Sequence, residues 1–141
     1  MVLSLCKRGI KTGGKTVEGV RYGFEELEVW QKAVEFAKQV IDIAERIQTD
    51  RKHYRLIEQV EAASTSIALN IAEGKGRYSK KEFMQFLYVA RGSLYETITL
   101  LIIFYKNGWL EQEELERIKT FGDEIGKMLS GLISSIRRAM S

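Results

Sequence analysis

The chain of 141 residues has the length of one domain, and its hydrophobic content of 45% is enough for a buried core. Its single cysteine, Cys6, and single histidine, His53, exclude an intramolecular disulfide framework and argue against a transition-metal site. The net charge of +3 arises in the first 22 residues, which have five basic side chains and one acidic side chain, whereas the remaining 119 residues have 17 and 18.

Residues 1–23 are rich in glycine and lysine and show no sustained hydrophobic period, so we predict a flexible basic tail before a bundle domain at residues 24–141. A functional basic arm is the alternative for this segment. Because the tail carries the excess charge, the bulk charge of the bundle gives no support to nucleic-acid binding. The first apolar residues precede the first charges, the reverse of a secretory signal, and the lone cysteine fits a reducing compartment, so we expect a cytoplasmic protein.

Two helices are predicted in the first half of the chain, which has no proline to interrupt them. Residues 24–48 carry two adjacent apolar seams at alternating steps of three and four, which makes an arc wide enough to touch more than one neighbouring helix. Residues 52–73 combine an apolar seam with many small side chains, which let a neighbouring helix approach closely. Gly74 is expected to end this helix in the left-handed conformation.

A third helix is predicted at residues 80–106, started by a capping box between Ser79 and Glu82. Residues 97–105 carry no charge on any face, which is typical of a helix that is buried all round. Since a monomeric bundle of this size exposes one side of every helix, we expect copies of the chain to associate. The longest apolar run, residues 100–105, is far shorter than the roughly 20 residues that span a bilayer, so no membrane span is expected.

A fourth helix is predicted at residues 111–139, with acidic side chains in its first turn and Arg137 and Arg138 in its last, as the helix dipole favours. Three glycines inside it each cost roughly 1 kcal/mol relative to alanine, which indicates close backbone approach within or between subunits: Gly122, Gly126 and Gly131. Short connections favour antiparallel neighbours. The predicted fold is therefore an all-α, up-down-up-down antiparallel four-helix bundle.

This topology places basic side chains at one end of the bundle. The start of the first helix, the turn between the second and third helices and the end of the fourth share that end. The candidate nucleic-acid-binding residues there are Lys75, Arg77, Lys80, Lys81, Arg137 and Arg138. Lys80 and Lys81 oppose the dipole at a helix N-terminus, which hints at a role beyond stability.

One stripe of the third helix extends this basic region. Its residues recur at steps of three and four and interleave basic and aromatic side chains: Lys81, Met84, Tyr88, Arg91 and Tyr95. Such a stripe can contact phosphates and stack on unpaired bases, and Arg91 joins the candidate binding residues for this reason. A helix face that packs against a sister subunit or is solvated is the alternative.

No catalytic or cofactor-binding pattern is found. The glycines at Gly74 and Gly76 lack the spacing of a phosphate loop, and no Glu-x-x-His pair of the di-iron bundle type exists. Ser64 and Ser66 have no histidine nearby in sequence to act as a base. Asn70 is interpreted as a satisfied polar contact between helices. We therefore expect no enzyme activity, no cofactor and no metal.

Several segments resemble one bacterial family, the four-helix-bundle proteins of intervening sequences in 23S rRNA genes, also called S23 ribosomal proteins, whose relatives include accessory proteins of diversity-generating retroelements. The similarity covers about residues 24–136. It rests on Phe24-Glu-Glu-Leu-Glu-Val-Trp-Gln-Lys-Ala, Asn70-Ile-Ala-Glu-Gly, Gly76-Arg with Ser79 and Glu82-Phe, and Gly92-Ser-Leu with Glu96 and Thr99. The chain departs from the family pattern at Ala68, where proline is common, and at Ile98, where a second glutamate is common.

The resemblance implies a ring-like homopentamer and, for the retroelement relatives, basic surfaces that bind nucleic acid and a reverse transcriptase. It places Lys75, Arg77 and Lys81 in the family's basic turn. Two functions follow as hypotheses. The first is a non-catalytic accessory scaffold that binds nucleic acid, RNA in particular. The alternative is a homo-oligomeric protein-interaction scaffold with no nucleic-acid role.

Overall fold

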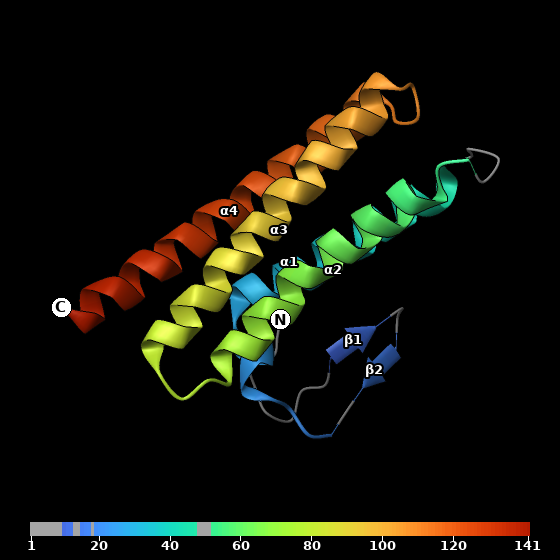
Figure 1. Ribbon diagram of the computed structural model, residues 1–141. Helices are drawn as coiled ribbons and strands as arrows, with labels where there is room; N and C mark the ends of the chain where they lie inside the picture. The colour runs from blue at the N-terminus through green and yellow to red at the C-terminus, as the bar shows by residue number, and fades with distance from the viewer. Residues whose placement is uncertain (1–9, 13–14, 18, 48–51) are drawn as a thin grey trace.

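The structure is a computed structural model, and it describes residues 10–12, 15–17, 19–47 and 52–141. Within these residues the chain forms four long helices, α1 (Glu28–Arg46), α2 (Tyr54–Lys75), α3 (Lys80–Lys106) and α4 (Gln112–Met140), as Figure 1 shows. They are preceded by two short antiparallel strands, β1 (Ile10–Thr12) and β2 (Lys15–Val17), and by a 3-10 helix, η1 (Gly23–Glu26). In the strand pairing, Ile10 lies opposite Val17.

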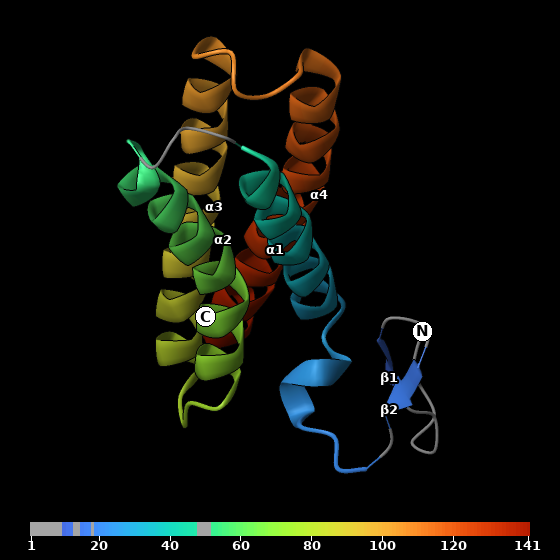
Figure 2. The same ribbon diagram turned by 90° about the vertical axis from the view of Figure 1, so that its right-hand side faces the viewer.

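Each helix packs against the helices before and after it in the chain, and α4 closes the bundle against α1 (Figure 2). The pair α2 and α3 has the most extensive contact, and the backbones of the diagonal pairs do not approach closely within the described residues. This is the arrangement of an antiparallel four-helix bundle and confirms the predicted all-α architecture. The association of copies into a ring stays a prediction.

The core lies along the bundle axis and takes its largest side chains from all four helices. Phe36 of α1, Phe104 of α3 and Ile125 of α4 have no exposed surface. Burying a side chain of this size stabilises the folded state by about 1.5–3 kcal/mol. The buried residues of each helix follow the apolar seams that the sequence predicts, because the step of three or four returns to the same face of a helix.

The start of the first helix differs from the prediction. The chain at Gly23–Glu26 forms η1 instead, and Leu27 has an extended backbone with φ −77° and ψ 123°, so α1 begins at Glu28 and not at residue 24. The side chain of Glu25 accepts a hydrogen bond from the backbone N–H of Tyr22 at 2.8 Å. This local contact competes with continuation of the helix, and η1 packs against both α1 and α2.

The prediction that Gly74 ends the second helix in a left-handed conformation is wrong. Gly74 is a buried residue inside α2, which continues to Lys75 and is followed by Gly76 with φ −83°. A Cβ atom on Gly74 would lie 2.6 Å from Cβ of Phe86 on α3. Glycine is required here because the two helices approach each other too closely for any side chain.

The segment interpreted as a tail contains the β1–β2 hairpin, which its composition did not indicate. Arg21 forms an ion pair with Glu26 at 3.1 Å. Residues 1–9, 13–14 and 18, with Cys6, Lys7 and Arg8 among them, lie outside the described residues. The flexibility of residues 1–23 stays a prediction.

By length and composition α3 could cross a membrane, which the short apolar run at residues 100–105 did not indicate, and it is the one such helix in the described part of the chain. Leu87, Leu101 and Phe104 of this helix are fully buried in the bundle core. The core helix of a soluble protein meets the same criterion, so α3 alone is weak support for a membrane span.

Candidate nucleic-acid interface

The turn between α2 and α3 is held in a defined geometry. The Ser79 hydroxyl accepts a hydrogen bond from the backbone N–H of Glu82 at 3.1 Å, which confirms the N-cap of α3. On the other side of the turn, the close contact of Gly74 with Phe83 and Phe86 fixes the end of α2 against α3. The side chains on this turn are therefore displayed from a rigid support.

The cations of this turn fall into two groups. Arg77 forms an ion pair with Glu73 at 2.9 Å, and its guanidinium carbon lies 4.7 Å from the centre of the Phe86 ring. Lys75, Lys80 and Lys81 are exposed and have no ion-pair partner among the described residues. Three charges are thus available to an anion, whereas the fourth is already engaged within the protein.

Tyr78 lies between these cations and is fully exposed. No sequence pattern indicated Tyr78, because a single tyrosine in a turn belongs to no periodic stripe of side chains. An aromatic ring that packs on nothing beside exposed lysines is a suitable stacking surface for a nucleotide base.

The end of α4 lies at the same end of the bundle as this turn (Figure 1), as predicted. Arg138 is exposed there and has no ion-pair partner in the described part of the chain. Arg137 donates a hydrogen bond to the Tyr88 hydroxyl of α3, and its guanidinium carbon lies 5.9 Å from the centre of that ring. Arg137 therefore joins α3 to α4 as well as adding charge.

Arg91 lies further along α3, away from the end of the bundle. Its guanidinium carbon is 5.1 Å from the centre of the Tyr88 ring, and it donates to the Ser130 hydroxyl of α4 at 3.0 Å. Tyr88 is thus contacted by two arginines, Arg91 and Arg137. The structure divides the seven candidate cations into two groups. One is an end cluster of Lys75, Arg77, Lys80, Lys81 and Arg138, and the other is the Arg91–Tyr88–Arg137 cluster on the α3–α4 face.

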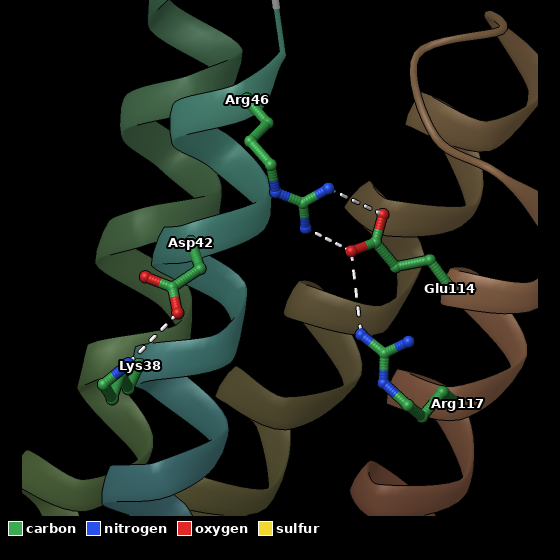
Figure 3. Close-up of polar contacts among 5 residues, drawn as sticks. All are labelled: Lys38, Asp42, Arg46, Glu114 and Arg117. Carbon is green, nitrogen blue, oxygen red and sulfur yellow. Dashed lines mark hydrogen bonds and ion pairs between the residues drawn. The ribbon is translucent and has the colours of Figure 1, made fainter.

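At the opposite end of the bundle, where α1 ends and α4 begins, an acidic side chain pairs with two arginines (Figure 3). Glu114 of α4 accepts hydrogen bonds from Arg46 of α1 and lies 3.6 Å from the guanidinium of Arg117. The hydrogen bond with Glu114 raises the pKa of Arg46 above its ordinary value. Away from this end, Lys32 near the start of α1 and Glu124 in the middle of α4 form another α1–α4 ion pair at 3.0 Å, and its hydrogen bond raises the pKa of Lys32.

The other polar residues singled out in the sequence have structural partners. The Asn70 side chain is satisfied within α2, where it donates to the carbonyl of Ser66 at 2.8 Å and to the Ser66 hydroxyl at 2.9 Å. The polar contact between helices is made by Ser66, whose hydroxyl lies 2.9 Å from that of Ser93 on α3. The buried hydroxyl of Ser64 donates to the carbonyl of Glu61 at 3.0 Å. No group of three or more His, Cys, Asp or Glu side chains within the described residues could hold a metal ion.

Comparison with known proteins adds two findings. Residues 25–131 match the family described as 23S rRNA-intervening sequence protein. The chain is also similar to the crystal structure of a protein of unknown function from the S23 ribosomal protein family of Bacteroides thetaiotaomicron VPI-5482, with 27% sequence identity and a TM-score of 0.70. That match covers 74% of this chain and 97% of the other. No curated protein matches the chain.

Proposed function

The chain belongs to the 23S rRNA-intervening sequence protein family, and we propose that it is a non-catalytic accessory scaffold that binds nucleic acid, RNA in particular, in the cytoplasm. Copies of the chain associate as a ring-like homopentamer and array their basic ends. A reverse transcriptase is the protein partner that the retroelement relatives suggest.

The observation that carries this proposal is the end cluster. Lys75, Lys80 and Lys81 are exposed on a rigid turn without acidic partners among the described residues, although acidic side chains pair with cations elsewhere in the bundle. Lys80 and Lys81 also oppose the dipole of α3, a placement that reduces stability slightly. Unpaired cations held in one place are what a phosphate backbone recognises.

Association of copies is supported by apolar side chains on the outer surface of α3. Residues 97–105 were expected to be buried all round, but in the single chain Ile103 is 42% exposed. Val89 on the same helix is 52% exposed. A sister subunit that covers these side chains would remove them from water, and it would bring several end clusters to one surface, which raises the number of phosphate contacts.

The test is a filter-binding titration with a structured RNA at roughly 50 and 200 mM salt. The variant replaces Lys75, Arg77, Lys80 and Lys81 by alanine. A matched control removes the same number of lysines and arginines elsewhere, at Lys38, Lys52, Arg55 and Lys106, all of which are exposed.

We expect the first variant to lose at least about tenfold in affinity at low salt. Its affinity should also depend less steeply on salt concentration, because fewer phosphate contacts mean that fewer counterions are released on binding. The control variant should retain most of the affinity. Equal losses in both variants would mean that only bulk charge matters, and unchanged affinity in the first would refute the site. Circular dichroism and light scattering verify that both variants keep their fold and assembly.

A protein-interaction scaffold without a nucleic-acid role is the second candidate. It is favoured by a groove of about 560 Å³ between α1 and α2, lined by Trp30, Val34 and Leu69, of which Leu69 is 65% exposed. The two candidates separate in the titration above, because this one predicts no RNA binding at either salt concentration.

A further inference from the structure

A second groove runs between α3 and α4, on the face that carries the Arg91–Tyr88–Arg137 cluster. It has a volume of about 670 Å³, and its lining includes Leu94, Tyr95, Ile98, Lys119, Lys127 and Ser130. Two glycines of α4 also line it, Gly122 and Gly126. Because they have no side chains, the Leu94 and Ile98 side chains beneath them form the floor of the groove. A Cβ atom on Gly126 would lie 3.4 Å from the Leu94 side chain, so the floor of the groove is apolar.

Aromatic rings stand along the α3 side of this groove. Tyr88 and Tyr95 are seven residues apart, which is about 10 Å along a helix and leaves both rings on the same stripe. Tyr95 is 58% exposed, and in the described part of the chain no ring or guanidinium packs on it. The Tyr95 ring therefore presents an open face at the rim of an apolar floor.

The charged side chains that line the groove are two lysines and one aspartate, all on α4. Lys119 and Lys127 lie on its α4 side, and Asp123 is its one acidic lining residue, paired with Lys127 at 3.2 Å. At the Ser130 end, the hydrogen bond from Arg91 connects the groove to the Arg91–Tyr88–Arg137 cluster. Glu96 of α3 is turned toward α2, where its carboxylate accepts from Gln59 at 3.2 Å, so it does not add negative charge to this face.

We propose that the α3–α4 groove binds unpaired nucleotides of a single strand, a substrate class that rests on and refines the proposed function. A base stacks on Tyr95 above the apolar floor, and the neighbouring phosphates contact Arg91 and Lys119. The combination of an open aromatic face, an apolar floor and flanking cations fits a chain that has both π-faces and negative charge. A duplex does not fit, because its bases are already stacked and paired.

The test compares two probes of equal length and charge: a 12-nucleotide oligouridine and the same ribose-phosphate chain without bases. The groove is filled by Gly126→Leu, whose new side chain starts in ordinary contact with Leu94. The matched control is Gly131→Leu on the same helix, where a Cβ atom would meet nothing within 4 Å. Both changes add the same side chain to α4.

We expect the unaltered protein to prefer oligouridine to the abasic chain by about tenfold or more, since stacking of one base is worth that factor. Gly126→Leu should abolish this preference and leave the affinity for the abasic chain unchanged, and Gly131→Leu should keep the preference. Tyr95→Leu keeps the site apolar but removes the ring, so it should also abolish the preference for oligouridine. If Gly126→Leu does not fold, this second variant tests the inference in its place.

Three results would contradict the inference in different ways. Equal binding of the two probes by the unaltered protein would refute the groove but leave the proposed function intact. No binding of either probe, nor of structured RNA, would refute both. If Gly126→Leu instead dissociates the oligomer in light scattering while Gly131→Leu does not, the groove is an interface between copies of the chain and the inference is wrong.

Discussion

The two ends of the bundle differ in whether an ion-pair network joins separate helices. At the end where α4 begins, Glu114 lies between Arg46 and Arg117, so acidic and basic side chains from α1 and α4 neutralise one another (Figure 3). At the other end, Lys75, Lys80 and Lys81 have no such partner among the described residues. The end where α4 begins thus has an ion-pair network between helices, although Lys52 and Lys106 near it also lack an ion-pair partner among the described residues. What distinguishes the other end is that its three unpaired lysines lie together on one turn.

The support behind the two ends differs as well. The paired end has ion pairs between two exposed arginines and the partly buried Glu114, and ion pairs with exposed partners contribute little stability each. The turn of the unpaired end is held by the contact of Gly74 with two phenylalanines and by the Ser79 cap. Packing supports both ends, since Leu110 is buried at the opposite end and Trp109 lies against Phe104 there. The ends differ in the interhelical ion pairs around Glu114, and three predictions test this difference.

The largest effect is expected for Gly74→Ala. Its Cβ would lie 2.6 Å from Cβ of Phe86 and 3.3 Å from the carbonyl oxygen of Phe83, so α2 and α3 must separate, which should destabilise the protein by about 1–3 kcal/mol. Gly131→Ala is the control, because its site is open and alanine favours a helix by up to about 1 kcal/mol. Urea unfolding measures both, and equal stabilities would show that the α2–α3 contact is looser than described.

A smaller effect is expected for Glu114→Gln, which removes the charge between Arg46 and Arg117. Because these arginines are well exposed, the loss should be at most about 1 kcal/mol, and it should shrink at high salt, where the ion pairs are screened. Glu113→Gln is matched to it, since Glu113 lies in the same first turn of α4 and has no ion pair with another described residue. A difference between the two that persists at 1 M salt would argue against an electrostatic origin, and RNA affinity should be unaffected by either.

The smallest effect on stability is expected for the double variant Lys80→Gln and Lys81→Gln. Removing two positive charges from the first turn of α3 should stabilise the protein by about 0.5 kcal/mol, because they oppose the helix dipole. RNA affinity should fall at the same time. Lys106→Gln, in the last turn of α3, removes a favourably placed charge and should change stability in the opposite direction. A fall in both stability and affinity for the double variant would refute the separation of binding from folding at this end.

The boundaries that the sequence predicted correctly are those set by local chemistry. Ser79 and Glu82 placed the start of α3 correctly, and the end at Lys106 follows from the Asn107–Gly108 pair, of which Gly108 has φ +80°. Gly74 was misinterpreted, because a glycine near a helix end can serve a left-handed turn or a close approach, and only the neighbouring helix decides between them. The start of α1 was missed because 3-10 and α-helical turns share the same short-range pattern.

The candidate site also has a part that local sequence predicts and a part that depends on contacts between helices. Lys75, Arg77, Lys80 and Lys81 lie close together in the sequence, on one short turn and the residues beside it, so their proximity could be predicted. The contacts of Arg137 with Tyr88 and of Arg91 with Ser130 join residues 49 and 39 positions apart, and no local pattern specifies them.

The sequence by itself determined the four helices, their antiparallel order and the end of the bundle at which the cations gather, because hydrophobic period, capping residues and short connections act within a few residues of one another. The tertiary structure alone decided which charges are neutralised, which glycine supports a helix contact and where α3 and α4 leave a groove. These depend on which side chains of separate helices face each other, and that is set by packing of the whole core.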